Sequence, residues 1–448
     1  MSKEESKNNL VDKIISFCKR RGFIFQSSAI YGGLGGFYDA GPLGVEMKRN
    51  LKEFWWKEMT QNHENIVGLD SSILMNPKVL QASGHLSAGF ADTLMECKKC
   101  HKRFKKEELK NDSCPECKGE MTDPKKFNLM MKTFIGPLED EASVAYLRPE
   151  TCQGIYLNFK NVLDSMRVKI PFGICQIGKS FRNEINPKNF IFRTREFEQM
   201  EMQWFCHPNK ADEFFEYWKE ERLKWYQNLG IKKEKLRATE VPKAESAHYA
   251  RKQVDIEYLF PFGWGEIEGI HNRGDWDLSN HSKHSGEDLM YFDEKTGKKY
   301  FPYIIETSVG VERLSFALLA DAYQEIEGGR TKTTKSVKKT EILLKIDKKI
   351  APIKIVVLPL VKNKPELVKK AKDVYATLKT HFVCRYDETG SIGRRYRRTD
   401  EIGVPFAITV DFDSLEQQDV TLRDRDTMNQ ERIKIKDLVS IIKEKLKD

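Results

Sequence analysis

Residues 178–202 read GKSFRNEINPKNFIFRTREFEQMEM, and this stretch decides the fold. Polar and apolar side chains alternate on both sides of Asn186 and Pro187, which predicts two antiparallel strands joined by a loop. Arginines, carboxylates and Phe197 would then share one face of a sheet. A guanidinium is a planar fork that fits phosphate oxygens, and a phenyl ring offers a face on which a flat base stacks. We therefore favour a site for ATP over the alternative, a solvated charged hairpin.

A second stretch supplies the other half of such a site. Residues 302–323 read PYIIETSVGVERLSFALLADAY, in which a short apolar strand is followed by a helix that begins near Val311. Arg313 lies in the first turn of this helix, where the helix dipole disfavours a cation unless an anion lies opposite. A helix N-terminus itself binds anions, so this N-terminus together with Arg313 predicts a bound phosphate. The alternative is an ordinary strand-turn-helix with a surface arginine.

Four cysteines form two Cys-x-x-Cys pairs within a charged insert at residues 96–126; they are Cys97, Cys100, Cys114 and Cys117. Two such pairs at short spacing are typical of a tetrahedral zinc site. Four protein ligands leave no open position for catalysis, so we expect the zinc to be structural. A pair of disulfides and a remnant that has lost its metal are the alternatives.

Composition places the chain among globular proteins of two or three domains, because its 448 residues are 40% hydrophobic and 32% charged. No apolar run is long enough to cross a bilayer, and the N-terminus is too polar for a secretory signal. The other five cysteines stand alone, as in a reducing compartment. We therefore expect a cytoplasmic protein with no membrane contact. The net charge of +9 permits a polyanionic partner without demonstrating one.

Periodicity predicts the remaining elements. In the first two-thirds we expect a helix at residues 44–59, a strand at 67–75 and a helix at 211–229 whose Trp218 and Trp225 are packing residues. Residues 330–349 form a basic linker with eight Lys or Arg against two Asp or Glu. Such a run is usually a solvated connector, although close to RNA it would also attract phosphates.

After the linker, strands alternate with helices, which predicts a small parallel or mixed α/β domain. We expect strands at residues 353–360, 382–386 and 405–410 and helices at 365–379 and 390–403. The last helix carries Arg394, Arg395, Arg397 and Arg398 around Tyr396. These arginines either face RNA, or two of them pair with Asp400 and Glu401.

Residues 178–202 and 302–323 resemble motifs 2 and 3 of the class II aminoacyl-tRNA synthetases, and the chain is most similar to the dimeric glycyl family. The resemblance covers nearly the whole chain and extends to IYGGLGGFYDAGPLGVEMKRN, NPKVLQASGH, LRPETCQGIYLNFKN, FPFGWGEIEGIHNRGDWDL and DETGSIGRRYRRTDEIGVPFAITVDFD. Two positions depart from the family pattern, which usually has Pro at Thr307 and commonly has Ala at Cys152.

The resemblance implies an α+β catalytic domain at residues 1–349, built on an antiparallel sheet flanked by helices. It also implies a small zinc-knuckle insert and a C-terminal α/β anticodon-binding domain at residues 350–448. The segment around residues 44–75 resembles motif 1, which packs at a dimer interface, so a homodimer is implied. Periodicity alone does not separate that segment from an ordinary core helix.

The implied reaction uses ATP to form glycyl-adenylate and then transfers glycine to tRNA(Gly). The catalytic residues would be Arg182 at the α-phosphate and Arg313 at the γ-phosphate. Phe197 would stack on adenine, Glu184 would lie near its amino group, and Glu266 is a candidate ligand for Mg²⁺ or, alternatively, part of a structural ion pair. The full ATP-binding set is Arg182, Asn183, Glu184, Phe192, Arg193, Thr194, Arg195, Glu196, Phe197, Glu266, Ile267, Gly310, Val311, Glu312 and Arg313.

Glycine requires a pocket that holds an ammonium group and excludes every larger side chain, and overpacking a rigid pocket is costly. Glu150, Glu201 and Glu306 would hold the ammonium, with a hydrogen bond from Ser308, and the resemblance brings Arg103 to the same substrate. The full glycine-binding set is Arg103, Glu150, Phe197, Glu198, Gln199, Met200, Glu201, Glu306, Thr307, Ser308, Val309 and Gly310.

Three other functions fit parts of the pattern. A synthetase for threonine, proline or histidine would share the class, but the RPETxQG and GWGExxG strings favour glycine. A catalytically inactive nucleic-acid-binding relative would have lost its phosphate-binding arginines, whereas Arg182 and Arg313 are present. A stand-alone adenylating enzyme would leave the C-terminal domain without an RNA to bind.

Overall fold

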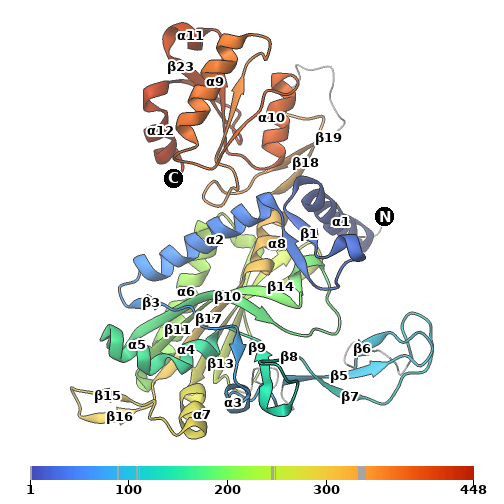
Figure 1. Cartoon of the computed structure of the whole chain (residues 1–448), viewed down its shortest axis with the longest axis vertical. Coiled ribbons are helices and arrows are strands. Elements are labelled where there is room, and N and C mark those ends of the chain that lie inside the picture. The colour runs from blue at the N-terminus through green and yellow to red at the C-terminus, as the bar shows by residue number, and fades with distance from the viewer. Residues whose placement is uncertain are drawn as a thin grey trace.

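The computed structural model describes residues 3–87, 90–106, 109, 111, 113–243, 247, 249–330 and 340–447. Figure 1 shows a large N-terminal unit and, above it, a smaller C-terminal unit that begins after the β18–β19 hairpin. Residues 331–339, in the predicted basic linker, lie outside the described residues. Within the described ranges, no helix is both long and apolar enough to cross a membrane.

A seven-stranded sheet forms the centre of the large unit. Its strand order is β12-β13-β14-β17-β11-β10-β3, and every pair is antiparallel except β10 with β3. The strands are β3 Ile66–Gly68, β10 Phe172–Phe181, β11 Glu196–Cys206, β12 Leu236–Glu240, β13 Lys252–Phe260, β14 Gly263–Gly274 and β17 Tyr303–Gly310. The predicted antiparallel sheet of the class II type is therefore confirmed.

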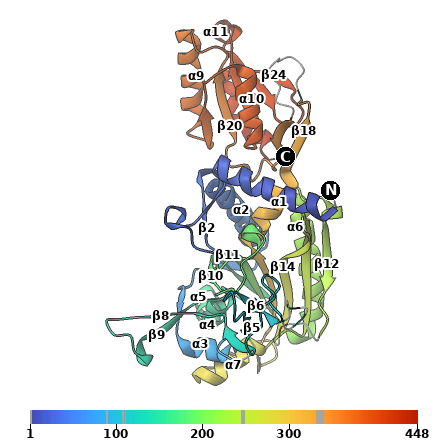
Figure 2. The same ribbon diagram turned by 90° about the vertical axis from the view of Figure 1, so that its right-hand side faces the viewer.

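Helices cover both faces of this sheet (Figures 1 and 2). The even-numbered residues of β11, such as Met200 and Met202, share a core with α1 Lys3–Arg21, α2 Pro42–Gln61, α6 Ala211–Asn228 and α8 Val311–Ala322. On the other face, Phe205 packs in a second core with α4 Cys152–Leu157, α5 Phe159–Met166 and α7 Trp276–Ser285. The predicted helices at 44–59, 211–229 and from Val311 are confirmed, and Trp218 and Trp225 are buried packing residues.

The predicted strand at residues 67–75 is wrong as a single element. Its first part is β3 of the central sheet, and its last part is β4 Leu74–Met75, which pairs with β9 Val144–Leu147 in a different sheet. The chain between them is fixed by a hydrogen bond of 2.7 Å from the Ser71 N–H to the Gln176 side chain. A local apolar pattern cannot show that its two ends belong to different sheets.

The predicted hairpin at residues 178–202 is confirmed as β10 and β11, but its strands are displaced along the sequence. Strand β10 ends at Phe181 and β11 begins at Glu196, so the arginines and Glu184 between them lie in the connecting loop. Asn189 and Phe190 have φ of 57° and 58°, which breaks the extended backbone there. Arg195 donates to Gly35 O at 2.6 Å, so the loop is fixed against the N-terminal segment.

Smaller sheets complete the large unit. The Cys-rich insert is a three-stranded sheet that projects from the side of the core in Figure 1. The insert strands are β5 Ala91–Glu96, β6 Arg103–Lys105 and β7 Lys125–Asn128. The other elements are β1 Ile24–Gln26, β2 Tyr38–Ala40, α3 Pro77–Ala82, β8 Met131–Phe134, β15 Tyr291–Asp293, β16 Lys298–Tyr300, β18 Tyr323–Glu327 and β19 Thr340–Leu344.

The C-terminal unit is a five-stranded sheet of order β21-β20-β22-β23-β24, with a parallel half and an antiparallel half. Its elements are β20 Ile355–Pro359, α9 Pro365–Leu378, β21 Cys384–Tyr386, α10 Ile392–Glu401, β22 Phe406–Val410, α11 Asp413–Gln417, β23 Asp419–Asp424, β24 Gln430–Lys434 and α12 Leu438–Lys445. The predicted mixed α/β domain is confirmed; its last two strands, α11 and α12 were not predicted.

The alternative in which two α10 arginines pair with Asp400 and Glu401 is wrong. Asp400 pairs instead with Arg423, at 2.9 Å, and with Arg330. Glu401 accepts two hydrogen bonds, of 2.8 and 2.6 Å, from Arg21 at the end of α1. The carboxylates of α10 therefore fasten the helix to its own sheet and to the large unit.

The burial of α6 gives a test of the fold. Trp218 is 0% exposed, whereas Tyr217 beside it is 42% exposed. Replacing Trp218 with Ala should lower the free energy of unfolding by about 3–5 kcal/mol, because a large cavity is left in the main core. Tyr217→Ala, the control, should cost about 1 kcal/mol or less. Urea unfolding followed by circular dichroism measures both, and equal costs would contradict this packing.

Candidate active site

One cavity of about 370 Å³ opens over the central sheet. It is lined by the β10–β11 loop, by the odd-numbered residues at the start of β11, and by β14, β17 and the first turn of α8. These segments are far apart in sequence, and the antiparallel register brings them together, with Glu201 opposite Ser308 and Gln199 opposite Gly310. The cavity therefore collects side chains from both of the motifs that the sequence singled out.

Two guanidinium groups, those of Arg182 and Arg313, lie at one end of the cavity. Arg182 donates to Pro149 O at 3.1 Å, and its Cζ lies 5.5 Å from the centre of the Phe197 ring. Arg313 donates to Phe192 O at 3.1 Å and pairs with Glu266 Oε2 at 2.9 Å. Because backbone carbonyls fix both arginines, their charges are held in place before an anion binds.

Next to Arg182, Glu184 provides a buried acceptor. Its Oε2 has no hydrogen-bond partner within the described ranges, although the residue lines the cavity and is only 9% exposed. A buried acceptor without a partner carries a free-energy cost until a donor reaches it. This position therefore suits a ligand N–H, such as an exocyclic amino group beside the Phe197 ring.

Three buried carboxylates, Glu150, Glu201 and Glu306, lie at the other end of the cavity. Glu306 Oε2 is 3.0 Å from Arg273, and its Oε1 is 2.8 Å from His271. Burial acts to raise the pKa of Glu306, but Arg273 and His271 outweigh it and lower that pKa to about 2. Glu306 is therefore ionised.

Glu201 differs from Glu306 in its environment. Thr151 donates to it, and Gln203 Nε2 bridges it to Glu306 with hydrogen bonds of 3.1 and 2.8 Å. Burial raises the pKa of Glu201 well above its ordinary value, and the charges of Glu306 and Glu150 raise it further. Charge at this end is therefore incompletely compensated, and a bound cation would stabilise Glu201 in its ionised form.

The structure brings most of the predicted residues to this cavity. The ones that line it are Glu150, Arg182, Glu184, Phe192, Arg193, Thr194, Phe197, Gln199, Glu201, Glu266, Glu306, Ser308, Gly310, Glu312 and Arg313. Nine other predicted residues do not line the cavity. Those on β11, β14 and β17 point to the opposite face, because neighbouring residues of a strand alternate, whereas Asn183 and Arg195 lie in the β10–β11 loop and Val311 lies in α8. The full set is Asn183, Arg195, Glu196, Glu198, Met200, Ile267, Thr307, Val309 and Val311.

Arg103 is not brought to the cavity. It is on β6 of the projecting insert, where its side chain is 64% exposed and pairs with Glu96 at 2.8 Å. Sequence reasoning also missed six cavity residues, Ile191, Ala247, Tyr249, Gln253, Gly269 and His271. Gly269 and His271 stood in the quoted string FPFGWGEIEGIHNRGDWDL, and their period-two spacing was the available signal.

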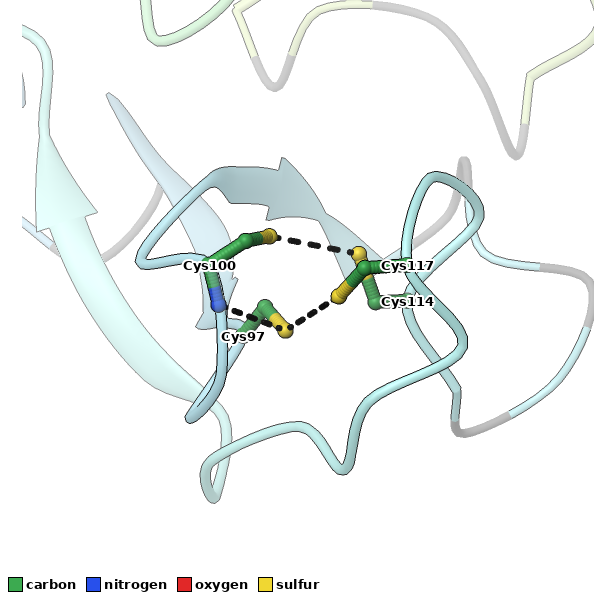
Figure 3. Close-up of side chains that lie close together, drawn as sticks. All are labelled: Cys97, Cys100, Cys114 and Cys117. Carbon is green, nitrogen blue, oxygen red and sulfur yellow. Dashed lines mark hydrogen bonds between the residues drawn. The ribbon is translucent and has the colours of Figure 1, made fainter.

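The four cysteines of the insert converge (Figure 3), with ligand atoms all within 4.8 Å of one another. Cys97 Sγ lies 3.4 Å from Cys117 Sγ, and Cys100 Sγ lies 3.7 Å from Cys114 Sγ. A Zn–S bond of about 2.3 Å implies tetrahedral S···S separations of about 3.8 Å, whereas a disulfide requires about 2.05 Å. The spacing fits four thiolates around one ion and excludes disulfides among these four.

The backbone between Cys97 and Cys100 supports the thiolate form of Cys97. The N–H groups of Cys100 and Lys99 point at Cys97 Sγ, at 3.5 and 3.4 Å. The Cys100 N–H, and less strongly the Lys99 N–H, lower the pKa of Cys97 to about 6 against the opposing effect of burial. A Cβ at Gly119 would lie 3.0 Å from Cys97 Sγ and 3.3 Å from Cys117 Sγ, so a larger residue would crowd the cluster.

Comparison with protein families matches both units. Residues 134–322 match the tRNA synthetase class II core domain (G, H, P, S and T), and residues 354–445 match the anticodon binding domain. The first match contains every residue that lines the cavity.

Curated relatives match along the whole chain. A glycine--tRNA ligase of Treponema denticola is 52% identical over 447 residues, covering 98% of this chain and 97% of that protein. Proteins of the same name from Clostridium acetobutylicum and Thermobifida fusca are 50% and 48% identical, each covering 98% of this chain and 99% of its relative. With these identities and a cavity that holds both predicted motifs, the chain belongs to the glycine--tRNA ligase family of class II aminoacyl-tRNA synthetases.

Proposed function

We propose that the chain attaches glycine to tRNA(Gly) at the expense of ATP, through a glycyl-adenylate. The observation that carries the proposal is the placement of two fixed guanidinium groups and three buried carboxylates at opposite ends of one cavity. An ATP phosphate chain and a glycine ammonium need these opposite charges. The carboxylate of glycine then lies between them, beside the α-phosphate.

In the first step, a glycine carboxylate oxygen attacks the α-phosphorus and the bond to the bridging oxygen of pyrophosphate breaks. Arg182 stabilises the negative charge that develops on the α-phosphate, and Arg313 holds the departing end. Phe197 stacks on adenine while Glu184 accepts from its amino group. In the second step, a ribose hydroxyl of the tRNA end attacks the glycyl carbonyl and AMP leaves.

Glu266 would hold Mg²⁺ beside the phosphates. It lines the cavity, and within the described ranges Arg313 pairs with its Oε2 alone. Glu312 is a poorer candidate for a Mg²⁺ ligand, because Lys48 pairs with one of its oxygens and the Glu198 N–H donates to the other. One carboxylate plus phosphate oxygens and water is an ordinary Mg²⁺ environment, in which the ion neutralises phosphate charge.

Glycine would bind at Glu150, Glu201 and Glu306, with Gln199 held 3.0 Å from Ser308 at the edge of the pocket. Arg273 does not line the cavity; it is 2% exposed, is held by Asp277 at 2.7 Å and pairs with Glu306 at 3.0 Å. Because these charged groups are fixed, a side chain larger than that of glycine would overpack the pocket at a cost in free energy.

The C-terminal unit would bind the anticodon end of the tRNA. Its match to the anticodon binding domain supports this role, as does Arg394, which is exposed on α10. Arg395 is excluded as an RNA contact in this conformation, because it is 1% exposed and donates to Pro359 O at 2.5 Å. We further propose a homodimer that works in the cytoplasm; Ile30 and Tyr31, exposed at 89% and 87% between β1 and β2, would suit a protein interface.

The identity of the amino acid is tested by ATP–pyrophosphate exchange with each amino acid in turn. Glycine alone should support exchange, because the carboxylate pocket accepts an ammonium and a larger side chain would overpack its fixed charged groups. Charging of tRNA with labelled glycine is the second measurement. Equal activation of alanine or serine would contradict the assignment.

The role of Arg182 is tested by substitution. Arg182→Ala should slow exchange by about 10²-fold or more, the scale of losing one preorganised charge contact. Arg182→Lys should recover only part of the rate, because a point charge cannot replace the guanidinium fork. Arg49→Ala, on an exposed side chain, is the control and should keep the wild-type rate. A near-wild-type rate for Arg182→Ala would remove the residue from the mechanism.

We also propose a structural zinc at the four insert cysteines, since their spacing and N–H···S contacts fit it. Protein made with zinc supplied should contain about one ion per chain by mass spectrometry. Cys97→Ser should lose it, whereas Cys384→Ser, in the C-terminal unit, should retain it. A wild-type chain without zinc under these conditions would favour a remnant site.

A further inference from the structure

Lys48 occupies an unusual position on α2, on the side of β11 that faces away from the cavity. Its side chain is 15% exposed and lies between two carboxylates from different parts of the chain. Lys48 Nζ is 2.6 Å from Glu198 Oε2 on β11 and 2.7 Å from Glu312 Oε1 on α8. Among the ion pairs of the described ranges, Lys48 is the cation that these two glutamates share.

The surrounding contacts make this a closed arrangement. Lys52, one turn along α2, binds the other oxygen of Glu198 at 2.7 Å. The backbone N–H of Glu198 donates to Glu312 Oε2, also at 2.7 Å. Both carboxylates are thus fully engaged, and the start of β11 is joined directly to the first turn of α8.

Both glutamates adjoin cavity residues in the sequence, and Glu312 itself lines the cavity. Glu198 follows Phe197, and Glu312 precedes Arg313. Period-two alternation turns Phe197 into the cavity when Glu198 points to α2. The position of Lys48 therefore affects two groups of the cavity that it does not touch. These are the Phe197 ring, proposed to stack on adenine, and the Arg313 guanidinium, proposed to hold the phosphates.

Electrostatics explains why the ammonium is needed. Burial by itself lowers the pKa of Lys48, but the attraction of Glu312 and Glu198 outweighs burial and raises that pKa above its ordinary value. Without the ammonium, two poorly solvated carboxylates would repel each other across a short gap. The start of β11 and the first turn of α8 would then move apart or one carboxylate would take up a proton.

We propose that Lys48 is a positioning residue that sets the spacing between Phe197 and Arg313, and so tunes ATP binding. This inference rests on the proposed function, because it takes the cavity to be the ATP site. Lys48 touches no substrate; it acts only through the two glutamates.

The test compares ATP affinity, measured by isothermal titration calorimetry, for Lys48→Met and the wild-type chain. The Kd for ATP should rise about tenfold, since a small displacement of positioning groups is costly. In exchange assays the KM for ATP should rise in parallel, while the KM for glycine should stay unchanged, because the carboxylate pocket is at the other end of the cavity. Lys48→Arg, which keeps a charge able to hold both carboxylates, should restore most of the affinity.

Lys57→Met is the matched control on the same helix. Lys57 is 54% exposed and, within the described ranges, forms its ion pair with Glu53, at 2.8 Å, so its loss should leave the ATP Kd unchanged. Thermal unfolding of each variant separates folding from positioning. If Lys48→Met is folded and binds ATP as tightly as the wild type, or loses thermal stability alone, the inference is wrong.

If Lys48→Met does not fold, Lys52→Met provides the test. Within the described ranges Lys52 pairs with Glu198 and not with Glu312, so its loss should weaken ATP binding measurably but less than tenfold. Unchanged ATP binding by Lys52→Met would overturn the inference. Failure of the proposed function is a separate outcome: a wild-type chain that shows no ATP binding and no glycine-dependent exchange.

Discussion

The alternation of side chains along β11 is the constraint on which the rest of the structure depends. The strand is paired on both sides, with β10 and with β17, so its register cannot slip by one residue without turning every side chain over. Odd-numbered residues from Phe197 to Glu201 face the cavity, and Met200 and Met202 face the main core. Glu198 is the exception on the core side, and its burial is tolerated because α2 supplies two lysines.

The same strand brings together charges that would not coexist in an apolar interior. Three buried glutamates share one end of the cavity, and buried carboxylates are costly unless paired. Arg273 and His271 compensate Glu306, while His85 lies 3.4 Å from Glu150. Glu201 accepts hydrogen bonds from Thr151 and Gln203, which are neutral, so they do not offset the burial and the charges of Glu306 and Glu150 that raise its pKa. A site left short of one positive charge binds an ammonium group and becomes more stable when it does.

Much of this organisation could be predicted from sequence, because the decisive residues are of few chemical types and cluster in two motifs. Arg182, Arg313 and Phe197 were predicted from residue chemistry, and the central sheet and mixed C-terminal domain followed from periodicity and resemblance. The sequence could not say which of five consecutive residues at 197–201 reach the cavity until strand register was known. Nor could it find partners distant in the chain, as with Arg423 for Asp400 or Gln176 for Ser71.

The number of arginines on α10 was a poor guide to how many of them could contact RNA. The run of arginines on α10 resembles an RNA-binding face, yet Arg395 is buried against carbonyls of its own sheet and Arg398 pairs with Asp387 at 2.6 Å. Glu401 of the same helix binds Arg21 at the end of α1, and Asp400 binds Arg330, which follows β18. Helix α10 thus fixes the C-terminal unit against the catalytic one. An RNA that bound its remaining exposed arginine would contact a surface already held in a set orientation to the cavity, so binding energy at one end of the tRNA could position the other.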